Sequence, residues 1–204
     1  MKISKTKFIY LISPNKINKD FCKSLKLVLS TNKVSFFQTR LKNYSLKEKI
    51  LIGRKIGKIC RSSKVKFIVN DDPWLAKKLN ADGCHLGQKD INIYEARKII
   101  GNKIIGITCH NSVRLAKIAI KSKASYLAFG AFYSTKTKKT KFNATAKILN
   151  KVKKFTKTPI VAIGGINDAN YKNLLLNNAN FLAISGYIWK NKKYKPLQAI
   201  ERLK

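Results

Sequence analysis

A short apolar run that recurs eight times along the chain constrains its fold more than any other feature. The runs are rich in β-branched residues and are continuous rather than alternating, which is typical of strands buried on both faces. We therefore expect strands at residues 8–13, 34–39, 66–70, 83–87, 103–108, 125–130, 159–164 and 180–185.

Segments with helical spacing lie between most of these runs. Apolar residues recur there at intervals of three and four, and polar residues that suit a helix cap precede them. Asn111 or Ser112 is expected to begin one helix, and Asn167 or Asp168 another. The predicted helices cover residues 45–59, 111–122, 167–178 and 193–203.

Strands that alternate with helices form parallel βαβ units, and eight such units close into a (β/α)₈ barrel. The chain has 204 residues, which is enough for one buried core. The fold typically takes about 250 residues, so little is left for insertions. We expect a single domain over residues 1–204. An open doubly wound sheet is the alternative, but it would need a G-x-G-x-x-G motif after an early strand, and none is present.

The chain is strongly basic, with 44 Lys and Arg against 9 Asp and Glu and a formal net charge of +35. This charge raises the alternative of a non-catalytic nucleic-acid-binding protein. However, Lys is spread along the whole chain, and Asn and Ile, which share A/T-rich codons with Lys, are also abundant. Compositional bias explains the charge better, so we expect no specific nucleic-acid partner.

The sequence also bears on location. No apolar run reaches the roughly 20 residues of a membrane helix, so no membrane partner is expected. The four cysteines are scattered and form no C-x-x-C pair, which indicates neither a zinc site nor a disulfide framework. We expect a cytoplasmic protein, whereas the sequence leaves open whether it forms homo-oligomers.

Polar or glycine residues follow nearly every predicted strand, at the end where barrel enzymes place their chemistry. Asp71 and Asp90 follow neighbouring strands, so both carboxylates are expected to face one mouth. Facing carboxylates repel unless a cation lies between them, and oxygen ligands favour Mg²⁺. Asp71 and Asp90 are therefore the predicted magnesium ligands. Asp72 and Asp82 are expected to act in a helix cap or turn, with Pro73 in a first helical turn.

Cationic residues near these acids predict a polyanionic ligand. Arg40, Lys42 and Lys138 all follow predicted strands and are expected to bind it. A second phosphate site is expected at Gly164-Gly165 and Ile184-Ser185. The loops after the seventh and eighth barrel strands commonly bind phosphate through backbone N–H groups.

Six motifs occur in order along residues 38–185. They are Q-x-R-x-K (38–42), V-N-D (69–71), A-D-G-x-H-L-G-Q-x-D (81–90), F-G-x-x-x-x-T-x-T-K-K (129–139), A-I-G-G-I (162–166) and A-I-S (183–185). Together they resemble the thiamine-phosphate synthase family. The resemblance implies a (β/α)₈ barrel enzyme, a transferase that joins hydroxymethylpyrimidine diphosphate to a thiazole phosphate carboxylate. The products would be thiamine phosphate, pyrophosphate and carbon dioxide.

The resemblance also implies roles for single residues. Asp71 and Asp90 match the magnesium ligands, and Thr108 stands where the family usually has a serine. Arg40 and Lys138 are expected to act in catalysis by stabilising the charge that develops on the departing pyrophosphate. The residues expected to bind the pyrimidine diphosphate are Gln38, Arg40, Lys42, Asn70, Thr108 and Lys138. Those expected to bind the thiazole phosphate are Thr135, Thr137, Gly165, Ile184 and Ser185.

The chain departs from the family pattern in the loop after the sixth predicted strand. Ala131 and Ser134 stand where prolines are common, and residues 140–147 lack the glycine that usually follows T-K-K. This loop is expected to close over the active site.

A related barrel, the thiazole tautomerase, is a second alternative. It also has A-I-G-G-I and binds thiazole phosphate, and the histidine matching His110 does its acid–base work. Retention of both carboxylates, with Gln38 and Lys42, favours the synthase. His85 and His110, the only two histidines, are expected to be hydrogen-bonded structural residues.

Overall fold

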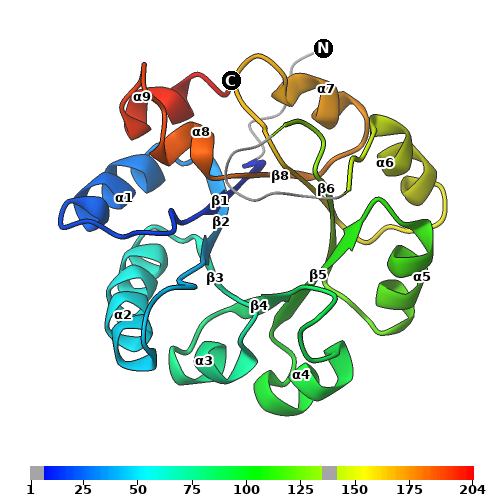
Figure 1. The fold of residues 1–204 in the computed structure, drawn as a ribbon, viewed down its shortest axis with the longest axis horizontal. Helices are drawn as coiled ribbons and strands as arrows, with labels where there is room; N and C mark the ends of the chain where they lie inside the picture. Colours follow the sequence, from blue (N-terminus) through cyan, green and yellow to red (C-terminus); the bar gives the residue numbers. More distant parts are fainter. Residues whose placement is uncertain (1–6, 135–141) are drawn as a thin grey trace.

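The computed structural model describes residues 7–134 and 142–204. Eight parallel strands pair in sequence order and close on themselves, so that β8 lies beside β1 (Figure 1). The strands are β1 (Ile9–Ile12), β2 (Val34–Thr39), β3 (Lys66–Asn70), β4 (Gly83–Leu86), β5 (Ile104–His110), β6 (Tyr126–Gly130), β7 (Ile160–Ile163) and β8 (Phe181–Ile184). The predicted (β/α)₈ barrel is confirmed, and every strand boundary lies within two residues of its predicted position.

Helices surround the barrel and cover its outer face (Figure 1). They are α1 (Phe21–Ser30), α2 (Leu46–Ser62), α3 (Pro73–Lys78), α4 (Ile93–Ile100), α5 (Val113–Lys121), α6 (Ala146–Lys153), α7 (Tyr171–Leu176), α8 (Gly186–Trp189) and α9 (Pro196–Glu201). None of the helices in the described part of the chain is long and apolar enough to span a bilayer.

Helix caps explain where several helices begin. Ser45 and Glu48 form a capping box at the start of α2, and the Ser112 side chain accepts a hydrogen bond from the Leu115 N–H at the start of α5. Asp72 caps α3 by accepting from the Leu75 N–H at 2.9 Å, and Pro73 is the first helical residue. The structural role predicted for Asp72 is confirmed.

The start of α7 differs from the prediction. The helix begins at Tyr171, after Asn170, rather than at Asn167 or Asp168. The Asp168 carboxylate instead accepts a hydrogen bond from Nε of Arg202, which lies close to the end of the chain. The local sequence pattern predicted a capping role for Asp168, but its carboxylate pairs instead with a charged residue far away in the sequence.

Side chains on the strands alternate between two apolar layers. Along β1, Ile9 and Leu11 pack outward among the helices, whereas Tyr10 and Ile12 point into the barrel. Along β6, Leu127 packs outward and Tyr126 inward. Apolar side chains thus fill much of the barrel interior, as is usual for this fold.

Candidate active site at the mouth of the barrel

A cavity of about 820 Å³ opens where the strands end. It is lined by seven residues that were predicted to bind the pyrimidine diphosphate or the metal: Gln38, Arg40, Lys42, Asn70, Asp71, Asp90 and Thr108. These residues come from β2, β3 and β5 and from the loops that follow β2, β3 and β4. Closure of the barrel therefore brings them to one place.

The carboxylates of Asp71 and Asp90 lie within hydrogen-bonding reach of each other. The Asp71 N–H donates to the backbone oxygen of His85 at 2.8 Å, and Oδ2 of Asp90 accepts from the Gly87 N–H at 2.6 Å. Burial raises the pKa of the Asp90 carboxyl, and the charge of Asp71 raises it further, whereas the Gly87 N–H and the Lys42 ammonium lower it. The backbone thus holds two repelling acids together.

This pair suits a hard divalent cation. Within residues 7–134 and 142–204, no three His, Cys, Asp or Glu side chains gather around one point. Asp71 and Asp90 would therefore supply two carboxylate ligands. That number fits Mg²⁺, which usually keeps several waters and takes its other contacts from substrate phosphates.

The two cationic residues that follow β2 are held differently. The Arg40 N–H donates to Oγ of Ser13 and its Nη1 donates to Oδ1 of Asn15, both at 2.9 Å. Nζ of Lys42 lies 3.3 Å from Oδ2 of Asp71, with 51% of the lysine side chain exposed. Arg40 is thus positioned by the loop after β1, whereas Lys42 forms a solvated ion pair that water screens.

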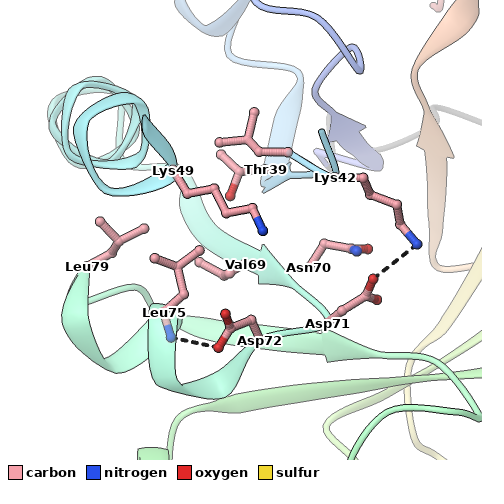
Figure 2. A pocket seen from close by; sticks show the side chains of 10 residues that line it. Thr39, Lys42, Lys49, Val69, Asn70, Asp71, Asp72, Leu75 and Leu79 are labelled. Carbon is pink, nitrogen blue, oxygen red and sulfur yellow. Dashed lines mark hydrogen bonds and ion pairs between the residues drawn. The ribbon is translucent and has the colours of Figure 1, made fainter. Parts of the chain in front are cut away.

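A smaller cavity of about 210 Å³ adjoins this region between α2, α3 and the ends of β2 and β3. Figure 2 shows Lys49 reaching into it from α2, with the Lys42–Asp71 ion pair and the Asp72 cap drawn as dashed lines. Lys42, Asn70 and Asp71 line both cavities. Lys49 is therefore a further cation near the predicted site.

A continuous chain of hydrogen bonds crosses the floor of the larger cavity. Nε2 of Gln38 donates to the Tyr10 hydroxyl at 3.0 Å, and the hydroxyls of Tyr10 and Tyr126 are 2.7 Å apart. His85 places Nδ1 2.9 Å from the Tyr126 hydroxyl and Nε2 2.9 Å from Oγ1 of Thr108. Both ring nitrogens of His85 are bonded, which confirms the role predicted for it.

Burial determines the protonation of this chain. It lowers the pKa of His85 to about 4, so the imidazole is neutral at pH 7. It raises the pKa of the Tyr10 and Tyr126 phenols well above their ordinary value, so both hydroxyls keep their protons. Every member is thus neutral and can both donate and accept, except the amide nitrogen of Gln38.

The residues predicted to bind a second phosphate lie at the ends of β7 and β8. Gly165 has φ of 64°, and a Cβ there would come within 2.4 Å of the Ser134 backbone oxygen. Ile184 packs in the outer apolar layer, so only its backbone can face a ligand. Oγ of Ser185 donates to the Ser13 oxygen at 3.2 Å. None of the three lines the 820 Å³ cavity, although their neighbours Ile163 and Ala183 do.

Thr135, Thr137 and Lys138 lie outside the described residues, so their roles stay predictions from the sequence. Phe142, just after this segment, lines the cavity and stacks on His110 with ring centroids 4.1 Å apart.

Sequence reasoning did not single out several residues that build this mouth. Ser13 and Asn15 follow β1 and position Arg40, and their place after a strand was a usable signal. Tyr10 and Tyr126 sit inside apolar strands, where they resemble ordinary core residues.

Comparisons with known proteins agree with this geometry. The family model for thiamine monophosphate synthase matches residues 9–188. The chain belongs to this family. The thiamine-phosphate synthase of Pelagibacter ubique (strain HTCC1062) is 66% identical over all of this chain and 98% of its own length. That of Erythrobacter litoralis (strain HTCC2594) is 39% identical over 94% of this chain and 92% of its own.

A solved structure leads to the same family. Thiamine phosphate pyrophosphorylase from Pyrococcus furiosus superposes with a TM-score of 0.85 at 28% identity, covering 98% of this chain and 95% of its own. The chain is thus a transferase with thiamine-phosphate synthase activity. Neither the tautomerase nor the nucleic-acid alternative is supported by these comparisons.

Proposed function

We propose that the mouth of this barrel binds hydroxymethylpyrimidine diphosphate together with Mg²⁺ and transfers the pyrimidinylmethyl group to the ring nitrogen of a thiazole phosphate carboxylate. One observation carries the proposal. The Asp71–Asp90 pair, the cations Arg40 and Lys42 and the polar floor that contains Gln38 all border a single cavity. The cations can neutralise the charge of a diphosphate, and the polar groups of the floor can form hydrogen bonds with a heterocycle.

The residues that surround the diphosphate account for bond cleavage. As the C–O bond to pyrophosphate breaks, positive charge develops on the pyrimidine methylene carbon and negative charge on the leaving oxygen. Arg40 and Lys42 stabilise that negative charge, and Lys138 joins them by resemblance. Asp71 and Asp90 would hold Mg²⁺, which when bound neutralises diphosphate charge as a Lewis acid.

The second half of the reaction needs no protein nucleophile. The thiazole nitrogen attacks the methylene carbon. The thiazole carboxylate then leaves as carbon dioxide, and the electron pair left on the ring carbon takes up a proton from water. Backbone groups at Gly165 and Ile184, with Ser185, would bind the thiazole phosphate. The positive φ of Gly165 supports this role, because such backbone turns direct N–H groups toward an anion.

A cytoplasmic location is part of the proposal. All four cysteines, Cys22, Cys60, Cys84 and Cys109, are free thiols, as in a reducing compartment. Burial raises the pKa of Cys60, Cys84 and Cys109 to about 12, so these three stay protonated and unreactive.

Incubation of the purified protein with both substrates and Mg²⁺ tests the function. Pyrophosphate and thiamine phosphate should appear in equal amounts and only when both substrates are present. A chelator should stop the reaction, and added Mg²⁺ should restore it. Change of the thiazole phosphate in the absence of the pyrimidine substrate, with no pyrophosphate release, would support the tautomerase instead.

A further inference from the structure

The hydrogen-bond chain on the cavity floor connects two residues that the proposed function places against one substrate. Its first member, Gln38, and its last, Thr108, both line the cavity. The three residues between them, Tyr10, Tyr126 and His85, come from β1, β6 and β4. Whether Gln38 donates or accepts a hydrogen bond is therefore coupled, across the barrel, to whether Thr108 donates or accepts one.

Two directions of hydrogen bonding use every hydroxyl proton of Tyr10 and Tyr126 within this row of hydrogen bonds. In the first, Gln38 donates through Nε2 to the Tyr10 hydroxyl, Tyr10 donates to Tyr126, and Tyr126 donates to Nδ1 of His85. Nε2 of the imidazole then carries the proton and donates to Oγ1 of Thr108. The Thr108 proton is left to donate into the cavity. Turning the Gln38 amide over reverses every bond and leaves Thr108 a donor to His85.

The anionic ligand favours the first direction. Oγ1 of Thr108 faces the same cavity as Arg40 and Lys42, where the diphosphate is proposed to bind. A diphosphate oxygen can only accept hydrogen bonds, so it favours a Thr108 hydroxyl whose proton is free to be donated. The same direction leaves Oε1 of Gln38, which has no partner among the described residues, as an acceptor.

We propose that Tyr10, Tyr126 and His85 are positioning residues that fix this direction, so that Gln38 accepts from the ring amino group of the pyrimidine and Thr108 donates to its diphosphate. The inference rests on the proposed function and goes beyond it by naming a device for substrate selection. A pyrimidine that carries an oxo group in place of the amino group would set its oxygen against Oε1 of Gln38. It would be rejected, because two acceptors would face each other.

Close packing of the aromatic rings holds these hydrogen-bonded side chains in place. The Tyr126 ring stacks on His85 with centroids 5.6 Å apart and meets Tyr10 edge-on at 5.6 Å. Gly106 of β5 makes room for this ring, since a Cβ there would come within 1.8 Å of Cζ of Tyr126. The hydroxyl of Tyr126 is thus held between its two partners by close packing.

The tautomer of His85 tests the direction of hydrogen bonding without a substitution at any of the five hydrogen-bonded residues. The protein has only two histidines, so ¹⁵N-labelled imidazole signals are few, and a His110→Asn variant identifies those of His85. We expect the spectrum at neutral pH to show a proton on Nε2 and an unprotonated, hydrogen-bonded Nδ1. A proton on Nδ1 would overturn the proposal.

Substrate discrimination tests the role. Calorimetry without the thiazole substrate would compare Kd for the amino-pyrimidine diphosphate and its oxo analogue. In Tyr126→Phe, which keeps the stacked ring, the preference for the amino compound should fall about tenfold, as one unpaired buried group costs roughly that much. A purely structural role would weaken both ligands equally, and an unchanged preference would refute the proposal.

Tyr171→Phe is the matched control. Tyr171 is as buried as Tyr10, but its hydroxyl bonds to the backbone of Lys204, outside the barrel. This variant loses a buried hydroxyl and should keep the preference of the wild type. Failure of the wild type to form thiamine phosphate would reject the proposed function itself. If the wild type forms thiamine phosphate but Tyr126→Phe keeps the wild-type preference for the amino compound, only the positioning role would be rejected.

Discussion

Asp82 and Asp90 lie at opposite ends of the same strand, β4, and are held in opposite ways. Before the strand, the Asp82 carboxylate accepts from the Phe67 N–H at 2.8 Å and from Nζ of Lys66 at 3.0 Å. After the strand, Asp90 accepts one backbone N–H and lies against a second acid, Asp71. One carboxylate is satisfied by the fold, and the other keeps oxygens for a ligand.

The difference shows how a barrel separates stability from chemistry. Asp82 joins the starts of β3 and β4, at the end of the barrel opposite the one where this fold places its active sites. Asp71 and Asp90 repel each other at the other end, which is a cost to the free protein. We therefore expect acids of the same type to contribute to folding at one end and to function at the other.

The largest effect is expected from removing one charge of the mouth pair. Asp71→Asn and Asp90→Asn should each lower turnover at least about 100-fold, because the pair would lose affinity for Mg²⁺ and with it stabilisation of the leaving charge. Steady-state kinetics over a range of Mg²⁺ concentrations measures this, and high Mg²⁺ should recover part of the rate. Turnover like that of the wild type in both variants would contradict the metal assignment.

Removing the Asp90 charge should lower turnover but raise thermal stability. In metal-free buffer near pH 7, Asp90→Asn should unfold at a higher temperature than the wild type. The amide removes a repulsive charge, and its oxygen can still accept from the Gly87 N–H. Differential scanning calorimetry of the two proteins checks the direction of the change. A lower Tm would show that Asp90 serves the fold, as Asp82 does.

Asp82→Ala should reverse this pattern. The variant leaves the Phe67 N–H without its partner, which should lower the free energy of unfolding by about 1–3 kcal/mol. The exposed Lys66 ion pair adds little to that loss. Urea denaturation measures the change, and turnover at a temperature where the variant is folded should match the wild type. A large loss of turnover in folded protein would erase the proposed division between the two ends.

The smallest effect is expected at Asp72, which neighbours Asp71 in the sequence. Asp72→Ala should cost about 1 kcal/mol of stability, because α3 loses its N-cap, while turnover changes little. Comparing its turnover with that of Asp71→Asn shows whether the reaction depends on the Asp71 carboxylate itself or on any change in this part of the backbone. Equal losses of turnover in the two would mean that the local backbone, rather than the Asp71 carboxylate, is what the reaction needs.

Much of the site could be predicted from the sequence because its signals are local. Asp71 directly follows a buried strand, and Gln38 and Thr108 fall at or near the ends of theirs, so their common mouth follows once the barrel is inferred. The cap at Asp72 is read from residues 72–75 in the same way. The motifs around these residues also implied the family, which the comparisons confirm.

By itself, the sequence determined the number and order of the strands and the cap at Asp72, because strand burial and helix capping act between neighbours along the chain. Tertiary structure alone decided that Asp168 binds Arg202 instead of capping α7. It also decided that Tyr10 and Tyr126 meet His85 inside the barrel. A tyrosine in an apolar strand looks the same whether it faces helices or the barrel axis. Only closure of the sheet places hydroxyls from distant strands within hydrogen-bonding distance of one another.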